Sequence, residues 1–131
     1  MKVTFVTTSF PAYKGHIQSP FIYQLAKHIA KQNVDLTVIT PNYKKSLKKQ
    51  ETLEGMKIKR FTYFIKPIQT LTEKGNISSF MKNPYAFIQM VCYLISMFFT
   101  TLKYSKNADV IHCQWALSGL VGVAVNKIRK K

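Results

Sequence analysis

Residues 2–40 read KVTFVTTSFPAYKGHIQSPFIYQLAKHIAKQNVDLTVIT, and this stretch decides the fold. Residues 3–8 are uncharged and rich in β-branched side chains, which favours an interior strand covered on both faces. Pro11 and Gly15 then interrupt any regular element. The pattern predicts a buried strand followed by a loop that carries Gly15 and His16.

A helix is predicted to begin at Ser19-Pro20, because a serine hydroxyl can accept an orphan backbone N–H and proline fits the first helical position. The helix is expected to end near Asn33, before a second apolar strand at Val34–Thr40. A helix that crosses between two such strands is normally right-handed and makes them parallel, so we expect a βαβ unit. The apolar side chains that share one face of this helix are Phe21, Ile22, Leu25, Ala26 and Ile29.

The later segments extend this unit. Tyr43–Gly55 is lysine-rich without a periodic apolar face and is interpreted as a mobile basic loop, whereas the partial alternation of Met56–Phe64 predicts an edge strand. Val110–Cys113 is a short uncharged run that fits a central parallel strand, and a last helix follows Gly119. The apolar positions of that helix are Leu120, Val121, Ala124, Val125 and Ile128. This order of elements predicts an α/β fold.

Tyr85–Leu102 contains no charged residue over 18 positions, which is long enough to raise the question of a transmembrane helix. A narrow polar stripe runs near one side of its helical wheel and consists of Gln89, Ser96, Thr100 and Lys103. A helix clamped between a sheet and its neighbours would show this pattern. We therefore expect a buried or interface-lying helix, with a membrane-inserted helix as the alternative.

The composition limits both compartment and partners. A chain of 131 residues supports one domain, residues 1–131, and its net charge of +15 implies anionic partners such as phosphorylated small molecules, acidic lipid head groups or nucleic acid. A basic solvated surface without a partner would account for the same charge. Cys92 and Cys113 lie in apolar runs and are expected to be buried free thiols of a reducing compartment. The first apolar run is too short for a secretory signal, so we expect a cytoplasmic location.

The candidate site follows from the rule that ligands of open parallel sheets bind beyond the carboxyl ends of the strands, where the strand order reverses. If the first strand and Asp109–Cys113 flank that reversal, two loops face each other there. Gly15 would let the backbone approach a ligand closely, and the helix that opens at Ser19 directs free N–H groups toward an anion. Alternatively, Gly15 only makes a turn, and His16 is an ordinary exposed loop histidine.

The second of these loops is Gln114–Gly119, and it follows His112, which ends an apolar strand and needs a partner if it is buried. Gln114 and Trp115 add an amide and a flat apolar face, a pairing that suits the hydroxyls and C–H faces of a carbohydrate. A satisfied core histidine is the alternative for His112. With only 5 acidic residues, no metal-ligand cluster and no convincing nucleophile–base arrangement, the sequence offers almost nothing for hydrolysis and predicts no metal site.

Several segments in this order resemble the start of family 4 glycosyltransferases: Lys2–Pro11, Gly15–Phe21, Leu25-Ala26 ahead of Val34–Pro41, and Asp109–Ala116. The resemblance implies the GT-B architecture, in which two Rossmann-like domains enclose the active site. It implies a retaining transfer of sugar from a UDP- or GDP-sugar to a glycan or lipid-linked acceptor. Residues 1–131 would then form an incomplete acceptor-side domain, a Rossmann-like parallel sheet with helices on both faces, lacking the donor domain and inactive alone.

The same resemblance assigns roles to the loop residues. Gly15, His16 and Ser19 would belong to the loop that approaches the donor phosphates, whereas His112, Gln114 and Trp115 would line the acceptor cleft. No cofactor is expected to bind this part of the enzyme alone. Two positions depart from the family, which commonly has two glycines where Gly15 precedes His16 and a histidine where Gln114 stands. Gln114 can still form hydrogen bonds, but it cannot carry a proton at neutral pH.

Charge and the apolar Tyr85–Leu102 segment add the expectation of a location at the inner face of the cell membrane. One alternative is a non-enzymatic basic module that binds nucleic acid or an anionic membrane. Its nucleic-acid form requires lysines clustered on one face with interleaved aromatics, whereas these lysines are scattered. Another is an unrelated nucleotide-sugar or flavin-binding domain, which the missing glycine fingerprint and the missing acid after Val34–Thr40 disfavour.

Overall fold

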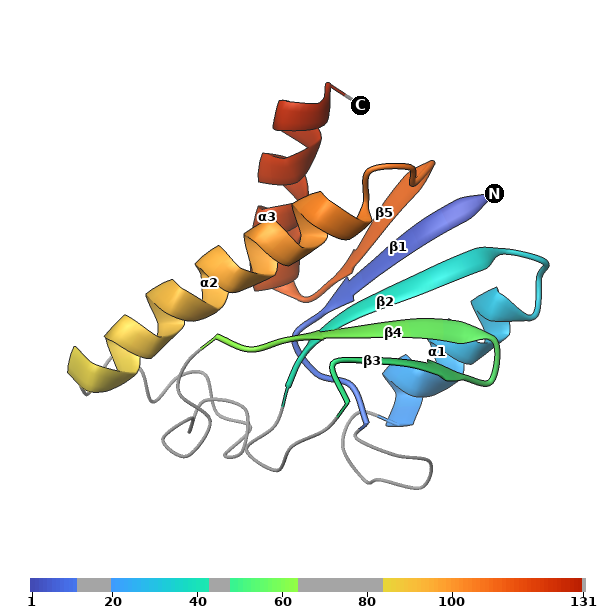
Figure 1. Ribbon diagram of the computed structural model, residues 1–131, viewed down its shortest axis with the longest axis horizontal. Coiled ribbons are helices and arrows are strands. Elements are labelled where there is room, and N and C mark those ends of the chain that lie inside the picture. The colour runs from blue at the N-terminus through green and yellow to red at the C-terminus, as the bar shows by residue number, and fades with distance from the viewer. Residues whose placement is uncertain (12–19, 43–47, 64–83, 131) are drawn as a thin grey trace.

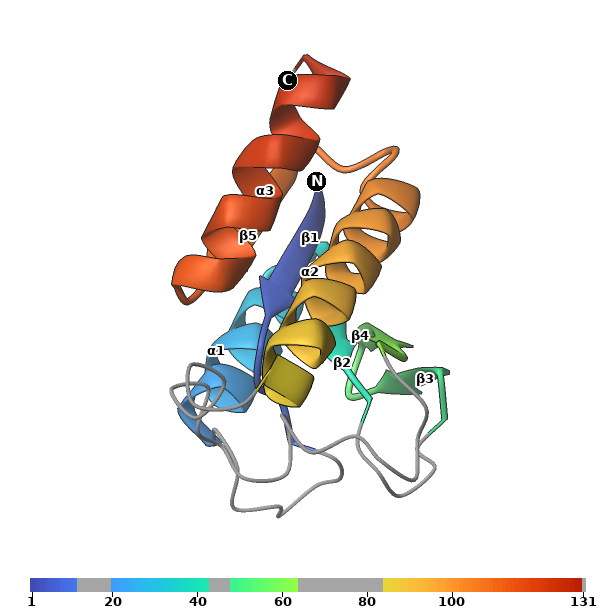
Figure 2. The same ribbon diagram turned by 90° about the vertical axis from the view of Figure 1, so that its left-hand side faces the viewer.

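The computed structural model describes residues 1–11, 20–42, 48–63 and 84–130, which form one sheet between two helical layers (Figure 1). In chain order the elements are β1 (Lys2–Thr7), α1 (Pro20–Ala30), β2 (Asp35–Pro41), β3 (Gln50–Leu53), β4 (Met56–Phe61), α2 (Pro84–Tyr104), β5 (Val110–Gln114) and α3 (Ala116–Arg129). Helix α1 covers one face of the sheet, and α2 and α3 cover the other face together (Figure 2). The predicted α/β class with a Rossmann-like sheet and helices on both faces is confirmed.

The sheet has the strand order β3-β4-β2-β1-β5. Strand β1 pairs in parallel with β2 on one side and with β5 on the other, so the strand order reverses between β1 and β5. Val3 lies beside Leu36 and beside Val110 in the two ladders. The predicted βαβ unit is therefore present, and the strand order reverses between β1 and β5, where ligands of such sheets bind beyond the carboxyl ends of the strands.

Strand β4 was expected at an edge, but β3 lies outside it and pairs with it antiparallel. Residues of β3 fall within the stretch interpreted as a basic loop. The hairpin turn explains the difference: Glu54 and Gly55 have φ values of 48° and 84°, the two consecutive positive φ angles of a type I′ turn. That turn twists in the sense of the sheet, so it holds a short polar strand that has no hydrophobic pattern of its own.

Strand β5 was expected in the centre of the sheet, yet it forms an edge of the described sheet and is only partly covered. Its first residue, Val110, is 45% exposed. The start of the strand is held to β1 by two hydrogen bonds, because the Lys2 N–H donates to the Asp109 carboxylate at 2.7 Å and the Asp109 N–H donates to the Lys2 carbonyl at 2.8 Å. These bonds set the register that aligns the far ends of β1 and β5.

Helix α1 packs through Ile22, Tyr23 and Ala26, whereas the expected core residues Phe21 and Leu25 are exposed. The buried face of α1 therefore includes Tyr23, whose hydroxyl donates a hydrogen bond to the Glu54 carboxylate in the β3–β4 turn. The same correction applies to α3, whose buried residues include Val121 and Val125 but not the expected Leu120 and Ile128.

Helix α2 lies against the sheet through Met90, Tyr93 and Met97, as expected for a buried or interface-lying helix. It is also long and apolar enough to cross a bilayer by length and composition. Part of its polar stripe faces the sheet side, since Gln89 is fully buried and the Ser96 hydroxyl donates to the carbonyl of Thr62, just after β4, at 3.3 Å. Apolar residues are therefore left on the opposite, outward side of the helix.

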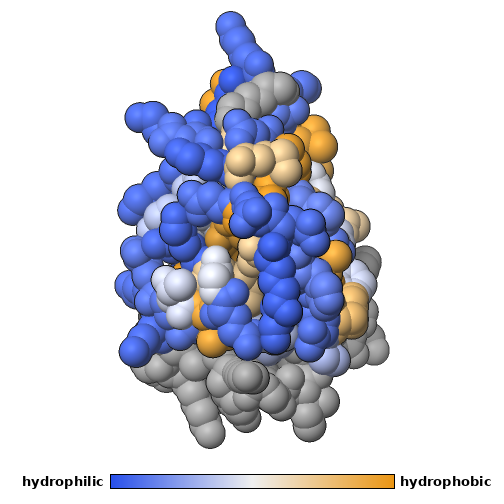
Figure 3. Space-filling view, turned by 90° about the vertical axis from the view of Figure 1, so that its right-hand side faces the viewer, coloured by the Kyte–Doolittle hydropathy of each residue, from blue (hydrophilic) through white to orange (hydrophobic). Residues whose placement is uncertain are grey.

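The acidic residues of the described chain are all engaged within the fold. Glu54 pairs with Lys27 at 3.3 Å, Asp35 with Lys57 at 2.8 Å and Glu51 with Arg60 at 2.6 Å, while Asp109 binds the β1 backbone. Most lysines therefore have no carboxylate to neutralise them. The side of the molecule opposite to that in Figure 2 is predominantly hydrophilic, with smaller hydrophobic areas (Figure 3).

Two glycines of α3 give a matched test of how closely this helix packs on β5. A Cβ added at Gly122 would overlap the Cys113 sulfur, whereas one added at Gly119 would have nothing within 4 Å. We expect Gly122→Ala to lower the free energy of unfolding by about 1–3 kcal/mol, and Gly119→Ala to raise it by about 0.5–1 kcal/mol. Urea unfolding followed by circular dichroism measures both. Equal stabilisation by the two substitutions would contradict the close packing, and Cys113→Ala is expected to rescue Gly122→Ala.

Tyr23 is expected to ionise at a higher pH than a tyrosine in an unfolded chain. Its burial, with smaller contributions from the hydrogen bond and the charge of Glu54, raises its pKa from 10.0 to about 12. The folded protein thus holds this proton more tightly than the unfolded chain, so the stabilisation is complete below pH 10 and is lost as the pH rises toward 12. Phenolate absorbance measures the titration. A step near pH 12 should disappear in Tyr23→Phe and move to lower pH in Glu54→Gln. A titration that neither substitution changes would contradict the assignment.

Candidate functional site

The ends of β1 and β5 form one edge of the sheet, and three of the predicted site residues lie at it: His112, Gln114 and Trp115. In the parallel ladder Phe5 lies beside His112, and Thr7 lies beside Gln114. The expectation that the first strand and the strand after Asp109 flank the reversal of strand order is confirmed. The carboxyl ends of both strands open on the same edge of the sheet.

His112 has partners on two sides. Its ring stacks on Phe5 with the centroids 4.9 Å apart and the planes 6° from parallel, and its Nε2 lies 2.6 Å from the Gln114 Nε2. The stacking on Phe5 and the contact with the Gln114 amide fix the orientation of the His112 ring. His112 in turn orients the Gln114 amide at the end of the strand.

Trp115 lies beyond the strand end in an unusual backbone conformation, with φ 75° and ψ 156°. This region is adopted almost only by glycine and costs about 1–3 kcal/mol for other residues. The Trp115 carbonyl explains how the conformation is held, since it accepts hydrogen bonds from the Ser118 hydroxyl at 2.9 Å and from the Gly119 N–H at 3.0 Å. The first turn of α3 therefore fixes the position of the indole.

An exposed aromatic pair results from this turn. The Trp115 ring packs edge-on against Phe21 at the start of α1, with centroids 5.9 Å apart, and the two side chains are 52% and 58% exposed. Phe21 was expected in the core, and only the tertiary structure places it here. The pair and the Gln114 amide give one apolar surface and one hydrogen-bonding group at the same edge, an arrangement that suits a sugar ring.

Gly15, His16 and Ser19 lie outside the described residues, so the predicted donor loop stays a prediction. Helix α1 does begin at Pro20, where the sequence pattern places its first turn. No group of three His, Cys, Asp or Glu residues that could hold a metal ion occurs within the described ranges.

Cysteine chemistry does not contribute to the site. Cys92 and Cys113 are both free and half-buried, less buried than the sequence suggested. Burial raises the pKa of the Cys113 thiol, and a backbone hydrogen bond from Gly122 only partly opposes this shift. The thiol therefore stays protonated at neutral pH and is a poor nucleophile.

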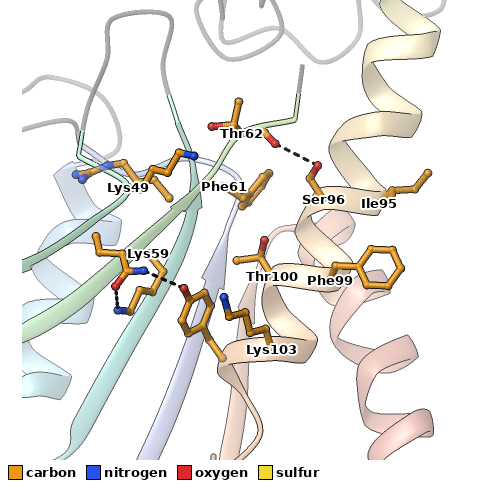
Figure 4. Close-up of a pocket in the computed structure, with 12 residues that line it drawn as sticks. Lys49, Lys59, Phe61, Thr62, Ile95, Ser96, Phe99, Thr100 and Lys103 are labelled. Atoms are coloured by element: carbon orange, nitrogen blue, oxygen red, sulfur yellow. Dashed lines mark hydrogen bonds between the residues drawn. The ribbon is translucent and has the colours of Figure 1, made fainter. Parts of the chain in front are cut away.

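A separate cavity of about 480 Å³ lies between the β3–β4 hairpin and α2 (Figure 4). It contains none of the predicted site residues. Its lining comes from three separate segments of the chain, so no local sequence pattern indicates it. The lining residues are Lys49, Gln50, Lys59, Arg60, Phe61, Thr62, Ile95, Ser96, Phe99, Thr100, Lys103 and Tyr104.

No protein-family model matches this sequence, and no curated protein sequence matches it significantly. Among solved structures, the whole of this chain is similar to part of sucrose-phosphate synthase from Thermosynechococcus elongatus, with a TM-score of 0.58 and 14% sequence identity. The chain spans 30% of the length of that protein. A likeness at this identity supports the Rossmann-like fold and leaves the resemblance to family 4 as a prediction.

Proposed function

We propose that this chain forms the acceptor-side domain of a retaining, family 4-type glycosyltransferase, which transfers a sugar from a UDP- or GDP-sugar to a glycan or lipid-linked acceptor. The observation that carries the proposal is the meeting of His112, Gln114 and Trp115 with the end of β1, at the one reversal of strand order in the described sheet. The fold likeness to sucrose-phosphate synthase agrees with it.

The residues at this edge would bind and orient the acceptor. Trp115 offers an apolar face to the C–H groups of a sugar, and the Gln114 amide offers hydrogen bonds to a hydroxyl. His112, held by Phe5, would act as a positioning residue for that amide. The transfer itself needs a bound nucleotide sugar, which a second domain would hold. The loop with Gly15, His16 and Ser19 would contribute to the donor phosphates from this side.

The chain offers a direct reporter for this proposal, because Trp115 is its only tryptophan. We expect soluble methyl glycosides, titrated one by one, to change the tryptophan emission in a saturable way for at least one sugar. Gln114→Ala should weaken that response about tenfold or more. Val123→Ala, on the outer side of α3, is the matched control and should not alter it. The absence of any saturable response to a panel of glycosides would overturn the acceptor site.

The domain assignment has its own test. Incubation of the purified chain with UDP-glucose or GDP-mannose and the glycoside that binds should give no transfer, because the proposal assigns the nucleotide sugar to a second domain outside residues 1–131. Clear turnover by residues 1–131 alone would show that this division of labour between two domains is wrong.

We also propose a cytoplasmic location at the inner face of the cell membrane.

A further inference from the structure

Helix α2 carries a strip of exposed apolar side chains along its outward side. Phe87, Ile88, Val91, Ile95 and Phe99 are between 41% and 61% exposed, and we call them the outer face of α2. Their spacing of three and four residues puts them on one side of the helix, over a length of about 18 Å at 1.5 Å per residue. Met90 and Met97, on the other side, already fill the core. An exposed apolar strip of this extent marks an interaction surface.

The cavity beside this strip is cationic. Lys49, Lys59 and Lys103 line it, and we call these three residues the lysine pocket. The ammonium groups of Lys59 and Lys103 lie over the same Tyr104 ring, 5.1 and 5.2 Å from its centroid. No carboxylate lines the cavity within the described part of the chain.

The neighbouring charges do not neutralise the lysine pocket. Arg60 already balances Glu51, with which it pairs at 2.6 Å, and the other described acids bind elsewhere in the fold. Lys59 is held by Gln50, to whose amide oxygen it donates at 2.7 Å, and Gln50 in turn donates to the Tyr104 hydroxyl at 3.1 Å. Like charges are thus brought together by neutral groups, an arrangement that favours a bound anion.

The outer face of α2 and the lysine pocket lie on different sides of the same helix, next to each other. In Figure 4 Ser96, Thr100 and Lys103 point toward the strands, while Ile95 and Phe99 point away from them. A helix that lies in a membrane interface needs this arrangement, with apolar residues toward the acyl chains and lysines beside them at the depth of the phosphates. The predominantly hydrophilic side in Figure 3 would then face water.

We propose that the outer face of α2 and the lysine pocket together form a docking surface for an anionic phospholipid bilayer. The apolar strip inserts at the boundary between head groups and acyl chains, and the lysine pocket receives lipid phosphate groups. This inference deepens the membrane location in the proposed function and is independent of sugar transfer, because none of these residues belongs to the β1–β5 edge.

Vesicle co-sedimentation tests the proposal. The full chain should bind vesicles of phosphatidylcholine with phosphatidylglycerol much more tightly than vesicles of phosphatidylcholine alone, and high salt should weaken the binding. Combined Lys49→Ala, Lys59→Ala and Lys103→Ala should reduce the affinity about a hundredfold, at about fivefold for each lysine near an anionic surface. Combined Ile95→Ser and Phe99→Ser should reduce it about tenfold or more.

Matched controls separate this surface from the general charge and hydrophobicity of the chain. Combined Lys31→Ala, Lys127→Ala and Lys130→Ala removes the same three charges from exposed sites elsewhere, and should weaken binding far less. Combined Leu120→Ser and Val123→Ser removes two apolar side chains that are 63% and 65% exposed on α3, and should leave binding unchanged. Thermal unfolding checks that every variant is folded.

Several outcomes would overturn the inference. Control variants that lose as much affinity as the test variants would show a diffuse electrostatic effect. Equal, salt-insensitive binding to both kinds of vesicle would show that lipid phosphate groups are not recognised. Binding of inorganic pyrophosphate at the lysine pocket without vesicle binding would make it a soluble-phosphate site. Self-association lost in Phe99→Ser, again without vesicle binding, would make the outer face a protein interface. The glycoside response of Trp115, measured on the same variants, reports separately on the sugar site.

Discussion

Replacement of Phe5 by alanine is expected to lower the free energy of unfolding by about 3–5 kcal/mol, a larger loss than we expect for any other single substitution in this chain. The Phe5 side chain is fully buried in the middle of β1, between the β2 and β5 ladders, and belongs to the core under α1. Its removal leaves a cavity that strands held by two ladders cannot close. The domain would retain little stability, since folded domains commonly have about 5–15 kcal/mol in total.

The substitution should also disturb the candidate site, because Phe5 supports the His112 ring at a centroid distance of 4.9 Å. Without that support the imidazole can turn away from Gln114, and the amide loses its orientation. Glycoside affinity is therefore expected to fall as well, measured at a temperature where the variant remains folded. Phe5→Leu, which fills most of the volume without a stacking face, separates the two effects: it should recover much of the stability and little of the binding.

The matched control is Phe99→Ala, which removes the same side chain from a position that is 61% exposed. Surface substitutions of this kind usually change the free energy of unfolding by about 0.5 kcal/mol or less. Urea unfolding of the two variants gives the comparison. Similar losses at positions 5 and 99 would mean that β1 is not the buried centre of the sheet.

The elements that sequence patterns predicted best are those whose burial is uniform. Strands β1 and β2 are covered on both faces, so an uninterrupted apolar run is an unambiguous sign of each. Strand β3 has the sequence QETL and no such run; it exists because the Glu54-Gly55 turn and the pairing with β4 hold it. Such a strand depends on tertiary contacts, which local patterns do not contain.

Helix orientation was harder to predict for a related reason. Helix α2 has apolar residues on two sides, so periodicity alone cannot decide which side meets the sheet. The polar stripe lies on one side of the helix, as the sequence predicted. Its contact with the segment after β4 depends on the hydrogen bond from the Ser96 hydroxyl to the Thr62 carbonyl, which no local pattern indicates. In α1 the hydroxyl of Tyr23 and its partner Glu54 shift the buried face, and Phe21 is left exposed as a result.

The candidate site was predictable only in part. Alternation along a strand places His112 and Gln114 on one face, and the end of the strand exposes Trp115. The stacking of His112 on Phe5 depends on the register of β1 and β5, and the contact between Trp115 and Phe21 depends on where α1 begins. Both contacts join residues about a hundred positions apart in the chain, beyond the reach of any local motif.

Trp115 gives the second large expected effect, which appears as opposite changes in stability and binding. Its φ and ψ of 75° and 156° suit glycine, so Trp115→Gly removes the strain while Trp115→Ala retains it. Both variants lose the edge contact with Phe21, worth about 0.5–1.5 kcal/mol. We therefore expect the free energy of unfolding to be about 1–3 kcal/mol higher for the glycine variant than for the alanine variant. The greater conformational entropy of glycine in the unfolded chain reduces this difference.

Binding should not follow stability in this pair. Each variant lacks the indole on which a sugar ring would stack, so each should lose glycoside affinity about tenfold or more, measured by calorimetry because the fluorescent reporter is gone. Equal stability of the two variants would show that the turn is unstrained. Undiminished binding in both would place the acceptor elsewhere. If the strain at Trp115 serves function, the protein should become more stable with glycine in place of the tryptophan and bind glycosides less well. If Trp115 were purely structural, both substitutions would lower the stability of the protein.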